Sequence, residues 1–303
     1  MMPYTAHLLM IAPVNFGFNA ETAVNNLFQK NSSGNIQQKA LQEFNGFVAL
    51  LQQNKIDITI IEDTHEPFTP DSIFPNNWIS FHESGNIILY PMFAPNRRLE
   101  RNEQVINIIK NKFKVNTIID LSHYEQDGIY LEGTGSMVLD RENKIAYACI
   151  SSRTDKSLFT GFCANNNLTA ICFNAKDKNG FAIYHTNVMM CVADAYTVVC
   201  LEAITNEKEK QQLVWSLKKT HKEIIAITMD QVKHFAGNML QVVNAANEKL
   251  LIMSEQAYRS LTPQQVQCLE KYNRILNAGL NTIETVGGGS ARCMMAEIFL
   301  PLK

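Results

Sequence analysis

The chain has 303 residues, 46% of them hydrophobic and 18% charged, which is enough to bury one large core or two ordinary ones. Its 27 basic and 29 acidic residues leave a net charge of −2, which excludes strong electrostatic attraction to nucleic acid or to an anionic membrane. The seven cysteines are odd in number and lie mostly in apolar runs, a pattern typical of reduced thiols in a cytoplasmic protein. The N-terminal segment has no basic stretch or cleavage site, so we expect no secretory signal and a cytoplasmic location.

Amphipathic segments alternate with short apolar strands along the chain. Apolar residues at three- and four-residue spacings predict helices over 35–55, 97–113, 206–221 and 262–275. Each is followed by a short apolar segment that we interpret as a strand, at 56–61, 115–121, 223–228 and 275–279. A further helix, degenerate in pattern, is expected near 154–166.

Pairs of strands recur between these helices at a nearly constant period. Each pair begins with a small or amide residue, continues as an apolar strand, a polar turn and a second apolar strand, and starts near Asn77, Gly135, Asn187 and Asn238. These starts are separated by 58, 52 and 51 residues, and another 51 residues lead to Gly289 in the segment GGGSARCM. The sequence therefore predicts about five copies of a ββαβ unit.

The fifth copy lacks its second strand, because the chain ends soon after GGGSARCM. The apolar N-terminal segment 7–14 is the obvious substitute. A ring that completes its last unit with its first strand leaves no sheet edge exposed, so we expect a closed radial arrangement.

The residues at the start of each unit are of catalytic and polar types. In a closed ring they would meet near the axis, bringing together a thiol, an imidazole, a carboxylate and several amides: Asn76, Asn77, Glu132, His185, Asn187, Asn238 and Cys293. Such a set fits a cysteine nucleophile, a general acid/base and an orienting group. Each residue alone also fits a structural role, a packed core thiol for Cys293 and a turn carboxylate for Glu132.

The segments FPNNW, LEGTGS, SSRT, HTNV, FAGNM and GGGSARCM, in this order, resemble the arginine deiminase and amidinotransferase superfamily, which modifies guanidino groups. The resemblance covers the whole chain and is nearest to the citrulline-utilisation hydrolase branch. It implies an α/β fold, the five-bladed pseudo-symmetric α/β propeller (pentein) of ββαβ units, as one catalytic domain over residues 1–303. It agrees with the repeat found in the sequence.

The resemblance also implies roles for individual residues. Cys293 would attack the central carbon of a guanidino or ureido group, His185 would protonate the leaving amine and then activate water, and Glu132 would hold the substrate N–H groups. Arg153 would grip the substrate α-carboxylate, for which a bidentate guanidinium is suited; its structural alternative is a surface arginine at a helix start. Asp127, five residues before Glu132, is a further candidate for substrate binding, with a solvated turn aspartate as its alternative.

The chain departs from arginine deiminases at two positions, where Asn77 and Asn187 replace the aspartates that embrace a guanidinium. A cation buried with few counter-charges is costly, whereas amides offer both donors and acceptors to a neutral ureido group. We therefore predict hydrolysis of citrulline to ornithine, ammonia and carbon dioxide through an S-carbamoyl cysteine. The alternatives are an arginine deiminase or dimethylarginine hydrolase, an amidinotransferase, and a binding scaffold without catalysis.

No cofactor or metal is expected. The histidines show no i, i+4 pair, no CxxC occurs, and the glycine run lacks the lysine and helix of a phosphate-binding loop. The expected partner is a small ureido or guanidino amino acid, and a homodimer is one option for assembly. Neither the oxyanion-binding groups nor the loop that covers the site can be assigned from sequence; the segments 95–101 and 153–160 are candidates for that loop.

Overall fold

The computed structural model describes residues 4–32 and 34–303, which form an α/β fold with five small mixed sheets. Each sheet has three strands, and its middle strand pairs antiparallel with one neighbour and parallel with the other. Four sheets follow the chain order: β3 (Ile79–Phe81), β4 (Asn86–Leu89), β5 (Thr117–Asp120); β6 (Val138–Asp140), β7 (Ile145–Cys149), β8 (Thr169–Phe173); β9 (Met190–Val192), β10 (Tyr196–Val199), β11 (Glu223–Ala226); β12 (Leu240–Val243), β13 (Lys249–Ser254), β14 (Arg274–Ala278).

The remaining sheet joins the two ends of the chain. Its middle strand β1 (His7–Ala12) pairs antiparallel with β15 (Ala296–Glu297) and parallel with β2 (Asp57–Glu62). Leu8 lies opposite Glu297 on one side and opposite Ile58 on the other. The prediction that the N-terminal strand completes the last unit is therefore confirmed.

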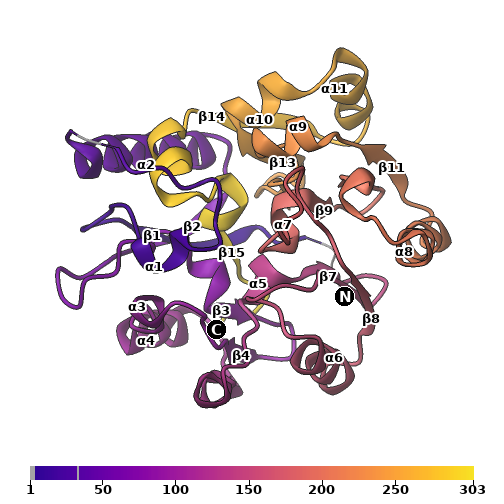
Figure 1. Ribbon diagram of the computed structural model, residues 1–303. Helices are drawn as coiled ribbons and strands as arrows, with labels where there is room; N and C mark the ends of the chain where they lie inside the picture. The colour runs from indigo at the N-terminus through magenta and orange to yellow at the C-terminus, as the bar shows by residue number, and fades with distance from the viewer. Residues whose placement is uncertain (1–3, 33) are drawn as a thin grey trace.

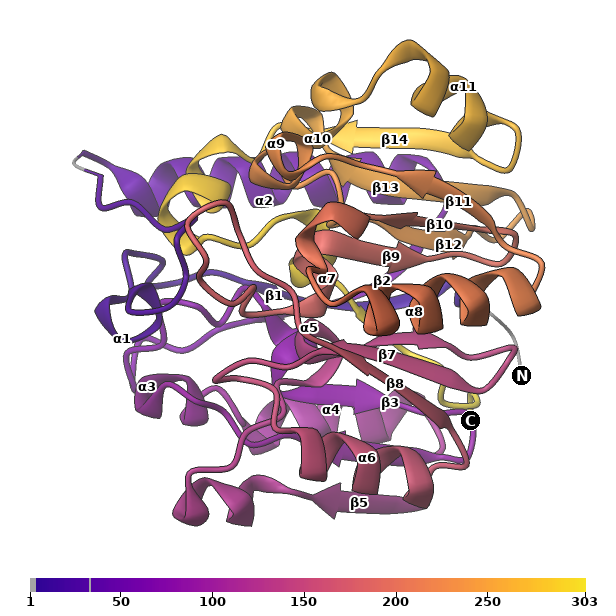
Figure 2. The ribbon, with the colours of Figure 1, turned by 45° about the vertical axis from the view of Figure 1, so that its right-hand side comes forward.

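A helix connects the two parallel strands in every sheet, as a parallel pair requires a long crossover. These helices lie at the periphery, around the five sheets (Figures 1 and 2): α2 (Ile36–Gln53), α4 (Glu103–Lys112), α6 (Lys156–Asn165), α8 (Glu207–Lys219) and α11 (Pro263–Glu270). Four of them match helices that the sequence predicted, with ends that differ by one or two residues except at the start of α4 and the end of α11. Shorter helices are α1 (Ala20–Ala23), α3 (Pro95–Arg98), α9 (Met229–Lys233) and α10 (Glu255–Ser260).

The helix expected near 154–166 is confirmed, because α6 is a regular helix of 10 residues in spite of its degenerate pattern. Asp155 caps it, accepting a 2.8 Å hydrogen bond from the backbone N–H of Leu158. Its buried face carries Leu158, Phe159, Phe162 and Cys163, so packing stabilises a helix whose amphipathic pattern is weak.

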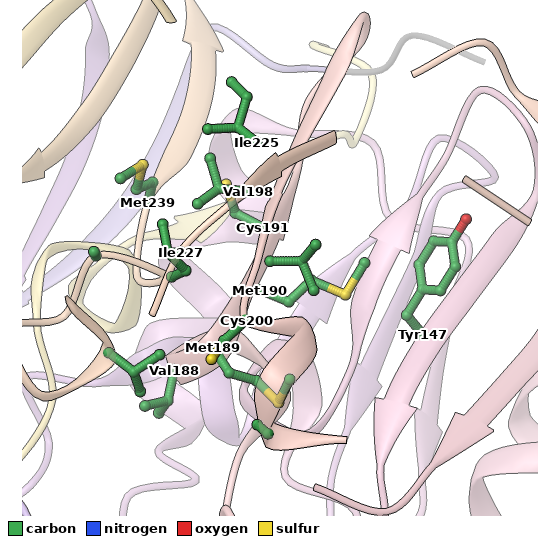
Figure 3. Packing of buried hydrophobic residues seen from close by; sticks show 14 of the residues in the cluster. Tyr147, Val188, Met189, Met190, Cys191, Val198, Cys200, Ile225, Ile227 and Met239 are labelled. Atoms are coloured by element: carbon green, nitrogen blue, oxygen red, sulfur yellow. The ribbon is translucent and has the colours of Figure 1, made fainter. Parts of the chain in front are cut away.

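Apolar packing joins neighbouring sheets through separate clusters of buried residues. The largest cluster includes Tyr147 of β7, Val198 of β10 and Leu251 of β13, which belong to three consecutive sheets. Figure 3 shows part of it, in which Val198 lies between Cys191 of β9 and Ile225 of β11. Among the residues that the structure describes, no helix is both long and apolar enough to cross a membrane.

The first strands of neighbouring sheets contact one another, β15 with β3, β6 with β9 and β9 with β12, and four of these strands are entered through a short helical turn. The turns are η1 (Pro75–Asn77), α5 (Gly133–Ser136), α7 (Thr186–Met189) and η5 (Ala291–Met294), while β12 follows the turn at Gly237 and Asn238. The turns contact one another, η1 with both α5 and η5, and α5 with α7. Figure 1 shows α5 and α7 near the centre. Residues separated by about 50 positions in sequence are thereby brought side by side.

Candidate active site

Cys293 lies in η5 and is buried, with 4% of its surface exposed. Its sulfur accepts hydrogen bonds from two side-chain amides, at 3.2 Å from Asn238 Nδ2 and 3.5 Å from Asn187 Nδ2. The backbone N–H of Cys293 donates to the carbonyl of Ser290 at 2.9 Å, which closes the turn that carries the thiol.

The three glycines before this turn are needed for close approach. A Cβ at Gly287 or Gly289 would lie within 2.9 Å of the ring of Phe74, and Gly288 has a left-handed φ of 66°. The carbonyl of Gly288 accepts a 2.8 Å hydrogen bond from the Tyr184 hydroxyl. The glycine run thus packs against the segment beside Asn77 and against the residue that precedes His185.

Glu132 and His185 form a buried pair at the N-terminal ends of α5 and α7. His185 Nε2 lies 2.7 Å from Glu132 Oε2, and Arg153 Nη1 lies 3.6 Å from the same oxygen. The other carboxylate oxygen accepts a 2.9 Å bond from the backbone N–H of Phe93. Glu132 is thus fixed by an imidazole, a guanidinium and a backbone donor.

The surroundings determine the protonation of this pair. Burial opposes ionisation of Glu132, but Arg153, the hydrogen bond and charge of His185, and Arg97 outweigh it and lower its pKa to about 2. Burial lowers the pKa of His185 to about 4 although Glu132 acts in the opposite direction. At neutral pH the ionised carboxylate of Glu132 therefore accepts a hydrogen bond from the protonated Nε2 of His185. Nδ1 of His185 carries no proton and is free to act as an acceptor.

Two asparagines precede β3 in η1, and they have different surroundings. Asn77 lines the cavity beside Cys293, with its Oδ1 accepting a 2.8 Å bond from Arg97 Nη1. Asn76 is fully buried, with its backbone carbonyl accepting a bond from Thr134 Oγ1 at 3.3 Å. Asn76 therefore connects η1 to α5, while Asn77 faces the cavity.

Asn187 and Asn238 hold neighbouring turns together around the thiol. Asn238 Nδ2 donates to the carbonyl of Asn187 at 3.0 Å, and Asn238 Oδ1 accepts from the backbone N–H of Arg292 at 3.0 Å. Asn187 Oδ1 is buried and has no hydrogen-bond partner within residues 4–32 and 34–303. Asn238 is thus committed to the protein, whereas Asn187 keeps a free acceptor at the site.

Arg153 lines the same cavity and is only 2% exposed, so it is not a surface arginine. Its Nη2 donates to the carbonyl of Thr22 at 2.8 Å, and it also donates to Asn25 Oδ1. Its guanidinium lies 4.9 Å from the centre of the Tyr184 ring. Arg153 therefore connects the Glu132 and His185 pair to the N-terminal segment.

The structure places Asp127 away from the site. It ends the turn η2 (Ser122–Asp127) and is exposed, and it does not line the cavity that contains Cys293. The next residue, Gly128, has a left-handed φ of 68°, which turns the chain between Asp127 and Glu132. Asp127 is therefore a solvated turn aspartate, the alternative interpretation of this residue, and not the substrate-binding residue that was predicted.

Two charged residues at the cavity were missed by sequence reasoning. Asp71 is buried, accepts 2.7 Å and 3.1 Å hydrogen bonds from Asn19 and Thr22, and has its second oxygen without a partner in the described part of the chain. Arg97 is also buried at the cavity. The signals were the position of Asp71 six residues before Asn77 and the arginine pair in PNRRLER.

A further segment lies against the cavity beside the two that the sequence named as candidates for the covering loop. Residues 19–29, which include α1, lie against the cavity through Asn19, Thr22 and Asn26, and the last donates to the Gly288 carbonyl at 3.2 Å. The segment 95–101 contributes Arg97 to the cavity wall, and 153–160 contributes Arg153. Hydrogen bonds between residues more than 100 positions apart, such as Arg153 to Thr22, have no periodic signal in the sequence.

Comparison with known proteins agrees with this geometry. A family model described as N,N dimethylarginine dimethylhydrolase, eukaryotic, matches residues 12–300. The chain belongs to this family. It is therefore a member of the arginine deiminase and amidinotransferase superfamily, as the sequence motifs predicted, and is homologous to hydrolases that act on guanidino carbon–nitrogen bonds. A search of the curated proteins gave no significant match.

Solved structures share the fold at low sequence identity. The apo structure of ArgZ, an arginine dihydrolase from the ornithine–ammonia cycle in Cyanobacteria, superposes with a TM-score of 0.77 at 16% identity over 98% of this chain. Unliganded AgrE gives a TM-score of 0.76 at 18% identity over 98% of this chain. The chain spans 41% of that ArgZ chain and 40% of that AgrE chain.

A third neighbour has a similar length to this protein. The dimethylarginine dimethylaminohydrolase (DDAH) from Pseudomonas aeruginosa, solved as a variant complexed with citrulline, gives a TM-score of 0.66 at 15% identity. The match covers 98% of this chain and 100% of that one. These likenesses establish the shared fold.

Proposed function

We propose that residues 1–303 form a single catalytic domain, a closed five-bladed α/β propeller. Five three-stranded sheets with the same strand order support this, as do the contacts of β15 with β3, of β6 with β9 and of β9 with β12. The pairing of β1 with both β2 and β15 joins the two chain ends in one sheet. The active site lies where the entry turns meet, at one end of the central axis.

The reaction is hydrolysis of a ureido amino acid, with citrulline giving ornithine, ammonia and carbon dioxide. The observation that carries this proposal is the Asn77 amide nitrogen, a buried donor with no partner among the described residues, in a cavity shared with Cys293 and His185. A ureido group has a carbonyl oxygen that accepts such a donor, whereas a guanidinium has only donors. Facing Asn77 Nδ2, a guanidinium would leave two buried donors unpaired.

The chemistry follows from the proton positions. Cys293 gives its proton to Nδ1 of His185 and attacks the ureido carbon, and Glu132 stabilises the resulting imidazolium. The bond from carbon to the δ-nitrogen breaks, the amine leaves with the proton from His185, and an S-carbamoyl cysteine remains. Water then gives a proton to His185 and attacks the same carbon. The carbon–sulfur bond breaks, the thiol is regenerated, and carbamate is released and decomposes to ammonia and carbon dioxide.

The other end of the substrate meets complementary charges. Arg153 is placed to bind an α-carboxylate, which would replace its bonds to the Thr22 carbonyl and to Asn25. The unpartnered oxygen of Asp71 is an acceptor for the α-ammonium group. A free α-amino acid therefore complements the charges of Arg153 and Asp71 better than an uncharged ureido compound does.

The test is ornithine release from L-citrulline and citrulline release from L-arginine, each measured with the unaltered protein, Cys293→Ser and Cys268→Ser. Cys268 is partly exposed in α11, so its variant is a matched control for thiol removal. Ornithine from citrulline that is lost only in Cys293→Ser supports the proposal. Activity on arginine or dimethylarginine without activity on citrulline would overturn the substrate while keeping the site.

A further inference from the structure

The side-chain amide of Asn77 has two chemically different ends, and the protein binds only one of them. Its oxygen accepts a 2.8 Å hydrogen bond from Arg97 Nη1. Its nitrogen has no partner within the described part of the chain, although the residue is only 3% exposed. An asparagine placed in this way has its acceptor occupied and its donor free.

Arg97 is itself held rigidly by Glu100 on the turn that follows α3. Nε and Nη2 of Arg97 donate to the two carboxylate oxygens of Glu100 at 2.8 Å and 2.9 Å, a bidentate pair. Nη2 also reaches the carbonyl of Phe74 at 3.2 Å. Arg97 and Glu100 are 2% and 5% exposed, so water competes little for these bonds.

The orientation of the amide follows from this arrangement. A guanidinium has five N–H donors and no acceptor, so only the oxygen of Asn77 can face it favourably. The reversed amide would place N–H against N–H and leave buried donors unpaired on both residues. The nitrogen is therefore directed away from Arg97, to the space beside Gly135, where the Cε1 and Nδ1 edge of the His185 ring also lies.

We propose that Arg97 and Glu100 are positioning residues that fix the Asn77 amide with its nitrogen toward the reacting group, and so select a ureido oxygen over a guanidinium. The inference rests on the proposed function, because it explains how one site prefers citrulline to arginine. The same nitrogen is placed to hold the negative charge that develops on that oxygen during attack by Cys293. An aspartate at position 77 would offer no donor in either orientation.

The experiment compares the ratio of kcat/KM for citrulline to kcat/KM for arginine in the unaltered protein, in Arg97→Met and in Glu100→Gln. Loss of an oriented donor to a developing charge predicts a fall in this ratio of about tenfold to a hundredfold in Arg97→Met. Glu100→Gln keeps one oxygen acceptor for the Arg97 guanidinium, so we expect a smaller fall in the ratio. Where turnover of arginine is too slow to measure, the ratio of dissociation constants in a Cys293→Ser background replaces it.

Two controls separate positioning from other roles. Arg98→Met removes the neighbouring arginine of the same helix, whose bonds go to the carbonyls of Met92 and Phe93, and leaves the ratio unchanged. In an Asn77→Asp background, Arg97→Met no longer shifts the ratio, because a carboxylate has no orientation to lose. Circular dichroism and urea unfolding identify any variant that fails to fold, and Arg97→Lys then replaces Arg97→Met, with a partial fall expected.

The outcomes are distinguishable. If Arg97 acted only by holding the amino-acid end of the substrate, the activities on citrulline and on arginine would fall alike, since both substrates share that end. An unchanged ratio in Arg97→Met would therefore overturn the proposal. The proposal is supported if Arg97→Met lowers the citrulline-to-arginine ratio when Asn77 is present but not in the Asn77→Asp background. An unaltered protein with no activity on citrulline overturns the proposed function and this inference together.

Discussion

Gly135 in α5 offers a sharp test of the site geometry, because its missing side chain leaves the space in which two functional groups meet. A Cβ at this position would lie 2.3 Å from Asn77 Nδ2 and 2.8 Å from both Cε1 and Nδ1 of His185. Such contacts are shorter than carbon and nitrogen atoms tolerate, so in Gly135→Ala both side chains must shift by roughly 1 Å. The substitution changes no charge and removes no hydrogen-bonding group.

The size of the effect follows from the displacement. A misplacement of about 1 Å in a reacting constellation costs about a hundredfold in rate, while overpacking a core site costs about 1–3 kcal/mol of stability. We expect kcat/KM for the substrate of the unaltered protein to fall about a hundredfold in Gly135→Ala. The free energy of unfolding should fall by no more than about 3 kcal/mol.

Gly161 provides the matched control. It lies exposed in α6, and a Cβ at this position would have no described atom outside its own helix backbone within 4 Å. Gly161→Ala should leave activity unchanged and raise the free energy of unfolding by about 1 kcal/mol, since alanine is the better helix former. The assays are steady-state ornithine release and urea unfolding of both variants. A folded Gly135→Ala protein with kcat/KM within about threefold of the unaltered protein would refute the placement of Asn77 and His185.

Other predictions concern pH and stability. Since the pKa of His185 is lowered to about 4, the acid limb of the kcat/KM profile should lie well below pH 6, and a limb at pH 6.5 would contradict a neutral imidazole. His185 and Glu132 both have folded pKa values below their unfolded ones, so each adds stability at neutral pH. This stability is lost as the pH falls, and urea unfolding should show the loss between pH 6.5 and 4 for His185 and between pH 4.5 and 2 for Glu132. Lys222→Met leaves Asp140, 3.2 Å from it, as an unpaired buried charge and should cost about 3–5 kcal/mol. Lys249→Met at the more exposed pair should cost at most about 1 kcal/mol in the same unfolding assay.

Much of the fold could be predicted from the sequence because its signals are local and repeated. The 3.6-residue pattern of apolar residues located α2, α4, α8 and α11, and a period near 51 residues located the entry turn of each sheet. That period also indicated Asn77, Glu132, His185 and Cys293 as residues that would meet, since identical units place equivalent positions at the same end. The helix α6 was also expected from the sequence although its pattern is weak, and it depends on a cap and on buried contacts with other elements.

Only the tertiary structure decided which charges reach the cavity and how they are held. Asp71 lies in a loop and Arg97 in the short helix α3, neither with a periodic signal, and the equally polar Asp127, five residues from Glu132, is exposed to solvent. The orientation of Asn77 depends on Arg97, which is 20 residues away in sequence, and Arg153 depends on Thr22, 131 residues away. Hydrophobic periodicity specifies which face of an element is buried, whereas a buried hydrogen bond depends on distances and angles that exist only after distant segments have packed together.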